Sequence, residues 1–236
     1  MKDASAIKAR ELTVRYPDGR VALSEVSFDI REGESVAVLG ANGAGKSTLL
    51  LSLVGVLRGT GEIEVGGVTV SADSLARVRR KAQLVFQDPN DQLFMPILKD
   101  DIAFGPLNFG VERDKVPEIV AKSLADVGLQ GFEERNPHQM SLGERRRAAI
   151  ATALACEPDI LLLDEPGAGL DPRGKKELVE LLKSLQATKL IATHDLDFAK
   201  SVCDTVLLLS AGRVVKTGPA AELLDDESTL QRCGLR

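Results

Sequence analysis

The sequence carries the stretch Gly40-Ala41-Asn42-Gly43-Ala44-Gly45-Lys46-Ser47 between a continuous apolar run, 35–39, and a leucine-rich segment of helical length, 46–57. The spacing G-x-x-x-x-G-K-[ST] is typical of a loop that wraps phosphates, because glycine leaves successive backbone N–H groups free to point at an anion. The apolar run predicts a strand buried on both faces, and the helix directs its positive dipole end at the loop. An ordinary glycine-rich turn is the alternative, and the strand–loop–helix context argues against it.

The polar residues of this stretch predict a nucleotide and a magnesium ion as its ligands. Lys46 supplies a full positive charge to the β- and γ-phosphates, and the Ser47 hydroxyl suits Mg²⁺. The residues that we expect to bind ATP here are Gly40, Asn42, Gly43, Ala44, Gly45, Lys46, Ser47 and Thr48.

A second chemical signal lies downstream, where the apolar run 160–163 ends in Asp164-Glu165. The carboxyl ends of strands in α/β sheets are where ligands bind. Asp164 suits a magnesium ion, held through a water molecule. Glu165 points elsewhere, and it suits a general base that polarises the attacking water. Acids also end strands for solvation alone, but the pairing with the phosphate loop favours a nucleotidase.

The rest of the chain alternates short β-branched runs with helical patterns, which predicts an α/β fold. Further strands are expected at 9–15, 26–30, 83–86, 189–192 and 206–209, a hairpin at 61–70, and helices at 116–127, 145–155, 175–185 and 196–202. Between about 98 and 155 helical patterns dominate, which predicts a helical lobe inserted between strands. The sequence has no internal repeat, so residues 1–236 are expected to fold as a single domain.

Composition argues against some partners and locations. A net charge of −5 argues against nucleic-acid binding, and no stretch approaches the ~20 apolar residues that span a bilayer. Any link to a membrane is therefore expected to pass through a partner. Three scattered cysteines are typical of reduced thiols in a cytoplasmic protein. The basic runs 77–81 and Arg145-Arg146-Arg147 we interpret as solvated faces or salt-bridged surface.

Several shorter motifs follow the phosphate loop in order: Phe86-Gln87-Asp88-Pro89, Met140-Ser141-Leu142-Gly143-Glu144-Arg145, Gly169-Leu170-Asp171 and Thr193-His194-Asp195. In this order they resemble the Q-loop, signature motif, D-loop and switch histidine of the ATP-binding cassette (ABC) family. The resemblance covers nearly the whole chain. It implies a P-loop ATPase with a mixed sheet, an N-terminal antiparallel β part and the inserted helical lobe.

The resemblance also implies roles for individual residues. Glu165, His194 and Gln87 would be catalytic, with His194 at the γ-phosphate and Gln87 at Mg²⁺ or the attacking water. Asp171 would signal across a dimer, and Tyr16 would stack on adenine. The residues that would act on the ATP of the other subunit are Ser141, Leu142, Gly143 and Glu144. Taken alone, a single histidine is more often structural, and Tyr16 is equally well a strand-end aromatic.

The sequence departs from the family pattern at three positions. Leu142 stands where the signature has its first glycine, Glu144 where it has glutamine, and Gly167 where serine or threonine follows Glu165-Pro166. Ser141 and Gly143 keep the hydroxyl and bare backbone that a γ-phosphate needs, and a helix expected to begin near Glu144 offers its N-terminus. We therefore expect hydrolysis to survive, with Glu144 close to the partner nucleotide's ribose.

The stretches 86–94 and 101–108 most resemble ATPases of energy-coupling factor (ECF) transporters, particularly the cobalt and nickel type. In that group the first of these segments lies beside a groove that accepts helices of a membrane coupling protein. The resemblance implies an importer of a metal ion or a vitamin, working at the cytoplasmic face of the membrane as a homodimer or a heterodimer. Integral coupling and substrate-binding proteins would be its partners.

Other classes of P-loop protein fit less well. A non-transport cassette ATPase usually carries tandem cassettes or a coiled-coil insertion, and this sequence has neither. A regulatory nucleotide-binding module would not need both Glu165 and His194. A small-molecule kinase would share the phosphate loop without needing the signature, Q-loop and histidine.

Overall fold

The computed structural model describes residues 4–235, and its centre is a six-stranded sheet in the order β10-β9-β3-β8-β7-β6. Five strands run parallel, and β10 pairs antiparallel with β9 at one edge. The strands of this sheet are β3 (Ser35–Leu39), β6 (Ala82–Val85), β7 (Ile160–Asp164), β8 (Thr188–Thr193), β9 (Thr205–Ser210) and β10 (Arg213–Pro219). Every residue of β3, β7 and β8 is buried, as the apolar runs 35–39 and 160–163 predict for the first two strands.

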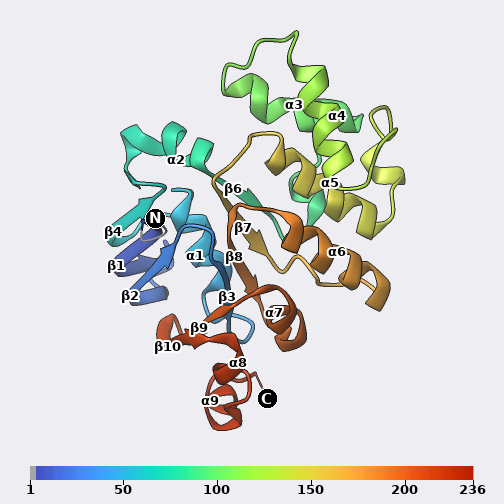
Figure 1. The fold of residues 1–236 in the computed structure, drawn as a ribbon. Helices are drawn as coiled ribbons and strands as arrows, with labels where there is room; N and C mark the ends of the chain where they lie inside the picture. Colours follow the sequence, from blue (N-terminus) through green and yellow to red (C-terminus); the bar gives the residue numbers. More distant parts are fainter. Residues whose placement is uncertain (1–3, 236) are drawn as a thin grey trace.

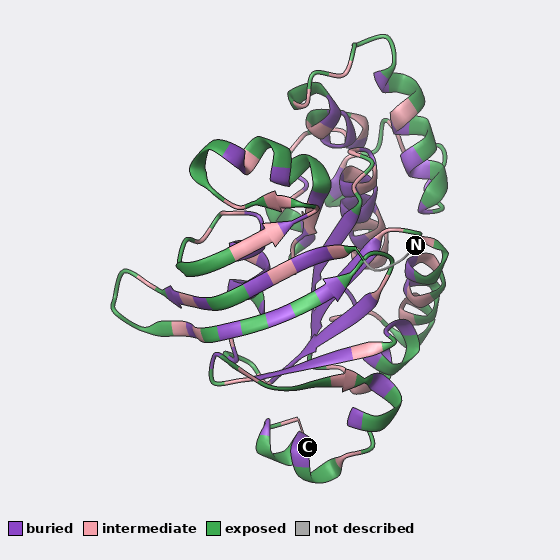
Figure 2. Cartoon of the chain, turned by 60° about the vertical axis from the view of Figure 1, so that its left-hand side comes forward, coloured by how far each residue is buried: buried purple, intermediate pink, exposed green. Residues whose placement is uncertain are grey.

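A second, antiparallel sheet has the order β2-β1-β4-β5 (Figure 1). It comprises β1 (Ser5–Arg15), β2 (Val21–Arg31), β4 (Thr60–Val65) and β5 (Val68–Thr69). Figure 2 shows buried and exposed residues alternating along its long strands, whereas the central strands are buried throughout. One face of this sheet therefore meets the interior and the other meets solvent.

The central sheet separates two hydrophobic cores. Alternate residues of β3 face opposite sides: Val36 and Val38 join one core, and Ala37 and Leu39 join the other. The first core contains leucines of α1 (Lys46–Leu53) and the inner face of the antiparallel sheet. The second lies under α6 (Pro172–Ser184), α7 (Leu196–Val202) and the helical lobe. Helix α1 is thus held between the two sheets, which fixes the loop at its N-terminus.

The helical lobe consists of α3 (Leu98–Asn108), α4 (Val116–Asp126) and α5 (Leu142–Leu154), which pack on one another. These helices follow β6 in the chain and precede β7, the strand beside β6 in the sheet. Figure 1 shows them together at one end of the molecule, beyond the β6 edge of the sheet. The expected helical insertion between strands is therefore observed.

The remaining helices connect or extend the sheets. They are α2 (Leu75–Lys81), α8 (Ala220–Leu223) and α9 (Glu227–Arg232), with short 3₁₀ turns at Ala72–Ser74, Pro89–Asp91 and Pro137–Gln139. Cys156, Cys203 and Cys233 are free thiols. Within residues 4–235, no helix has both the length and the apolar character needed to cross a membrane.

The predicted fold class is confirmed, and several predicted boundaries are wrong. The helix expected over 46–57 ends at Leu53, and the helix expected to begin near Glu144 begins at Leu142. Strands β1 and β2 have 11 residues each, longer than predicted. Their solvent-facing residues are polar, and Glu11 and Glu25 interrupt them with positive φ angles of 50° and 55°. An apolar pattern shows only part of such strands.

Candidate active site

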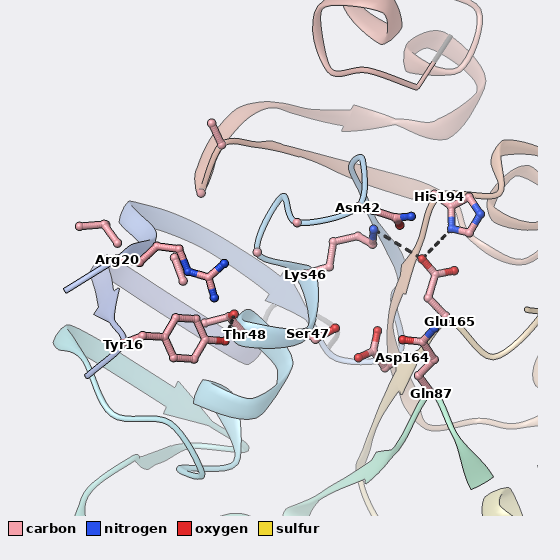
Figure 3. A pocket seen from close by; sticks show the side chains of 16 residues that line it. Tyr16, Arg20, Asn42, Lys46, Ser47, Thr48, Gln87, Asp164, Glu165 and His194 are labelled. Carbon is pink, nitrogen blue, oxygen red and sulfur yellow. Dashed lines mark hydrogen bonds and ion pairs between the residues drawn. The ribbon is translucent and has the colours of Figure 1, made fainter. Parts of the chain in front are cut away.

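One cavity of about 600 Å³ gathers most of the residues singled out in the sequence (Figure 3). Its walls come from the β1–β2 connection with the start of β2, the loop before α1 with the first turn of that helix, Gln87 two residues after β6, the ends of β7 and β8, and the turn between β9 and β10. The residues that line it are Tyr16, Arg20, Val21, Ala22, Asn42, Gly43, Gly45, Lys46, Ser47, Thr48, Gln87, Asp164, Glu165, His194, Ala211 and Gly212. It lies at the carboxyl ends of the parallel strands, where α/β sheets place ligands.

Lys46 is the buried cation of this cavity, with only 7% of the residue exposed. Its ammonium donates to the Gly40 carbonyl at 2.7 Å and to the Ala41 carbonyl at 3.3 Å, and lies 3.5 Å from Glu165 Oε1. The loop therefore curls around its own lysine. This geometry holds a positive charge at the N-terminus of α1, where helix dipole and backbone N–H groups also favour an anion.

The glycines of the loop serve two purposes rather than the one expected from sequence. Gly43 has a φ of +80° with open space where a Cβ would lie, which suits a backbone exposed to a ligand. Gly40 instead lies against β9: a Cβ there would be 2.3 Å from the Leu209 carbonyl oxygen. Gly40 therefore lets the loop pack closely on the sheet. Neither Gly40 nor Ala44 lines the cavity.

Asp164 presents an oxygen suited to a hard cation. The residue is 9% exposed, and its Oδ1 is buried without a hydrogen-bond partner within the described chain. Burial raises the pKa of this carboxyl, while a hydrogen bond from the Ser47 side chain opposes the rise. An unpaired carboxylate oxygen beside a hydroxyl fits Mg²⁺, which takes few protein ligands and keeps several waters.

We predict that Asp164→Asn raises the thermal stability of the nucleotide-free chain by about 2–4 °C, the shift that ~1 kcal/mol gives in a protein of this size. The pKa of Asp164 is higher in the folded chain than its ordinary value of 3.8, so ionisation of this carboxyl lowers the free energy of unfolding. That loss sets in as pH rises from 3.8 through the folded-state pKa, and the advantage of asparagine is therefore present at neutral pH and disappears on acidification. Thermal melts without nucleotide or metal, recorded from neutral pH downward, check this. A stability gain that grew on acidification would contradict the burial argument.

Glu165 points away from Asp164, as expected for adjacent acids of different function. Its Oε1 lies 2.8 Å from His194 Nδ1, and its Oε2 accepts from Thr193 Oγ1 at 3.0 Å. Its φ of +43° lies in the left-handed region, which is uncommon for a residue other than glycine. The backbone N–H donates to the Ala192 carbonyl at 2.8 Å. These contacts hold the carboxylate towards Lys46 and His194, and Figure 3 shows the three side chains converging.

An aromatic residue closes the opposite end of the cavity. The Tyr16 hydroxyl shares a hydrogen bond of 2.8 Å with Thr48 Oγ1, which fixes the ring to α1. The guanidinium of Arg20 lies 4.9 Å from the ring centroid. Sequence reasoning missed Arg20. The sequence did contain a signal for it: Tyr16 and Arg20 flank the stretch Pro-Asp-Gly, which is typical of a turn, and a turn there brings the two side chains together.

The signature residues and Asp171 do not line this cavity. Ser141 caps α5, and its hydroxyl donates to Glu144 Oε2 at 2.7 Å, a bond that lowers the pKa of the Glu144 carboxyl. Asp171 caps α6 by accepting from the Gly174 N–H at 2.6 Å. The Leu142 side chain lies against the turn at Gly169: a Cβ added to Gly169 would be 3.1 Å from Leu142 Cδ2. The two motifs thus form a second face, separate from the cavity.

The interpretation of Arg145-Arg146-Arg147 as solvated or salt-bridged surface is wrong for Arg146. That residue is buried, at 7% exposed, and donates to backbone carbonyls around the cavity. Arg147 fits the interpretation, since it forms an ion pair with Glu177 at 3.1 Å. Every residue has a backbone carbonyl, so the sequence cannot show which arginine will bond to one, and it did not distinguish Arg146 from Arg147.

The phosphate loop, the adjacent acids and the parallel sheet define a P-loop protein that binds a nucleoside triphosphate. The sequence profile of the ABC transporter family matches residues 23–168. The chain belongs to that family and is an ATPase.

Three proteins show how similar this chain is to particular members of the family. It is 42% identical over 236 residues to the energy-coupling factor transporter ATP-binding protein EcfA of Methanocaldococcus jannaschii, covering 98% of this chain and 85% of that one. The structure of cbiO1 from Clostridium perfringens, part of the ABC transporter complex cbiONQ, matches with a TM-score of 0.86, 36% identity, and coverage of 99% and 96%. A dimeric post-hydrolysis structure of the ATP-binding cassette MJ0796 bound to ADP and Pi matches at 0.81, with 28% identity and coverage of 91% and 98%.

Proposed function

We propose that this chain is the ATP-hydrolysing subunit of an ECF-type importer, and that residues 1–236 act as one ABC ATPase domain. The similarity to EcfA and to cbiO1, a part of a transporter complex, supports this class. In this proposal the chain works at the cytoplasmic face of the membrane and drives uptake of cobalt, nickel or a vitamin. Integral coupling and substrate-binding proteins provide the path of the transported solute across the membrane.

The geometry of the cavity supports the following route for hydrolysis. Lys46 stabilises negative charge on the β- and γ-phosphates, and Tyr16 offers its ring to adenine. Glu165 accepts a proton from the water whose oxygen bonds to the γ-phosphorus as the bond to ADP breaks. His194, hydrogen-bonded to Glu165 Oε1, orients that carboxylate and contacts the γ-phosphate. Ser47, Asp164 and Gln87 would hold Mg²⁺, which supplies charge neutralisation at the phosphates when bound.

The second half of the site comes from another subunit in this proposal. Ser141 and Gly143 lie outside the cavity, at the N-terminus of a 13-residue helix, a position that favours an anion. The similar cassette MJ0796 forms a dimer bound to ADP and Pi. We infer that two chains, identical or merely similar, enclose two ATP molecules between their cavities and signature faces. Asp171 then signals between the subunits.

An exposed aromatic pair shortly after Gln87 carries the transport proposal. Phe94 and Phe104 are 58% and 46% exposed, and their rings meet edge to face with centroids 5.2 Å apart. Leu107, at 41%, extends the patch by one turn of α3. Three of the six large exposed apolar side chains of the described chain therefore gather in this segment. A grouped apolar patch marks an interaction surface.

The aromatic pair is held on a defined backbone. The carboxylate of Asp101, 4% exposed, accepts from the N–H groups of Phe94 and Met95 at 3.0 Å each. The loop that carries Phe94 is thereby tied to α3, which carries Phe104. A fixed apolar platform that begins seven residues after Gln87 suits the end of a helix from a membrane coupling protein, and in this proposal a movement of the platform is passed along that segment to Gln87 at the cavity.

Purification from membranes tests the transport proposal. We expect the wild-type chain to retain integral membrane proteins, and Phe94→Ser with Phe104→Ser to lose them. Val56→Ser is the matched control, because Val56 is 54% exposed and lies outside the patch. Thermal melts confirm that each variant is folded, and uptake of labelled cobalt, nickel or vitamins identifies the cargo. Retention of the membrane proteins by the double variant would contradict the docking surface, and association with ribosomes or DNA instead would point to a non-transport ATPase.

A further inference from the structure

Arg146 is a buried arginine whose partners are all backbone carbonyls. Its Nη1 donates to the carbonyls of Glu165, at 3.1 Å, and Gln87, at 3.2 Å, and its Nη2 donates to the Ala168 carbonyl. Its Nε is buried without a hydrogen-bond partner, and within residues 4–235 the guanidinium makes no ion pair. A single side chain therefore joins α5 to two other segments, the one after β6 that carries Gln87 and the turn from Glu165 to Ala168 after β7.

Burying this charge is unfavourable, so its presence calls for a reason. Burial lowers the pKa of Arg146, and the carboxylates of Asp88 and Glu165 act in the opposite direction without contacting it. A buried guanidinium without a paired carboxylate contributes less stability than an apolar side chain of similar size. Packing alone would favour methionine or leucine at this position.

The three carbonyls belong to the segments that shape catalysis. Gln87 is the residue at the cavity edge, and Glu165 is the general base of the proposed reaction. Ala168 lies in the turn that follows Glu165 and leads to Asp171. Glu165 also has the left-handed backbone described above, and its carbonyl accepts from the Ala168 N–H at 3.1 Å as well as from Arg146. The donation from Arg146 thus braces the turn that aims the base.

Arg146 lies on α5, five residues after Ser141, which caps the same helix. A 13-residue helix moves as a rigid body, so a displacement at its N-terminus reaches Arg146. In the proposed dimer the N-terminus of α5 contacts the ATP of the other subunit. The signature face and the catalytic base are therefore joined mechanically through one side chain.

We propose that Arg146 is a positioning residue that couples the signature helix to the Glu165 turn, so that closure on one nucleotide aims the base at the other. This inference rests on the proposed composite site. It requires arginine rather than lysine, because donors on two separate nitrogens reach carbonyls in different directions, while an ammonium is a single point.

Three variants of the full chain test it: Arg146→Met, Arg146→Lys and the control Arg147→Met. Arg147 is the next residue of α5, and its replacement removes the ion pair with Glu177 of α6. We expect both Arg146 variants to lower kcat by about 10–100-fold, the scale of a misplaced catalytic group, with KM for ATP nearly unchanged. The melting temperature of Arg146→Met should hold or rise. A merely structural role predicts instead that stability and KM suffer together with kcat.

Hydrogen exchange gives a readout that does not depend on turnover. Amides of residues 165–171 should exchange faster in both Arg146 variants than in the wild type, and should be unchanged in Arg147→Met. Wild-type kcat in Arg146→Met, or unchanged exchange in that segment, would overturn the proposal. Should Arg146→Met fail to fold, Arg146→Lys decides. If the wild-type chain hydrolyses ATP only as a monomer, the composite site is refuted. The exchange data would then still show whether Arg146 holds the Glu165 turn in place.

Discussion

Replacing Glu165 with glutamine is expected to lower ATP turnover by roughly 10²–10⁴-fold while ATP still binds. Glu165 is 6% exposed, and its carboxylate is held between His194 Nδ1 and Thr193 Oγ1, so it cannot swing away from the cavity without breaking both contacts. Glutamine has the same shape but no carboxylate to accept the proton of water. Binding relies on Lys46 and the loop, which the change leaves in place.

Steady-state hydrolysis and equilibrium nucleotide binding check this prediction together. Glu157→Gln is a matched control: Glu157 also has a left-handed backbone, with φ of +47°, but it pairs with Lys122 and lies outside the cavity. Its turnover should equal that of the wild type. Near-normal turnover in Glu165→Gln would remove Glu165 from the reaction and require another base.

Replacing Lys46 with alanine is expected to weaken ATP binding by roughly 30- to 5,000-fold, which corresponds to ~2–5 kcal/mol for the loss of a buried, hydrogen-bonded charge. The lysine is nearly buried, and its ammonium is the only one among the cavity-lining residues. Its removal leaves Asp164 and Glu165 facing the phosphates with less opposing charge, which weakens binding further.

Calorimetry with ATP at fixed salt measures the effect, since electrostatic affinities change with ionic strength. Lys81→Ala serves as the control, because that lysine pairs with Asp159 at the surface, outside the cavity. Unchanged affinity in Lys46→Ala would mean that the loop does not cradle phosphates.

Residues of the phosphate loop and the two acids at the end of β7 line one cavity, and the sequence could predict this grouping because the pattern of each motif is local. In the loop from Gly40 to Ser47 and in the acids that end β7, adjacent residues act together, so spacing alone reveals them. The buried strands were predicted for the same reason. The prediction that Tyr16, Gln87 and His194 belong to one site came from the family resemblance, because these residues are far apart in the chain.

What the sequence missed depends on contacts between distant backbones. Arg146 bonds to carbonyls 59, 19 and 22 residues away, and a carbonyl has no residue identity that a pattern can show. Gly40 is explained by the approach of β9, more than 160 residues later in the chain. The ends of β1 and β2 were missed because the solvent face of an antiparallel strand tolerates polar residues.

In the proposed active site a second chain completes the cavity, and sedimentation of Glu165→Gln with ATP and Mg²⁺ tests this composite site. Blocked hydrolysis should trap the closed state, so we expect a dimer that holds two ATP molecules. The dimer should be lost when Gly143→Arg is added, because a bulky side chain there would fill the signature face. A Glu165→Gln chain that binds ATP yet stays monomeric, or a dimer indifferent to Gly143→Arg, would contradict the composite site.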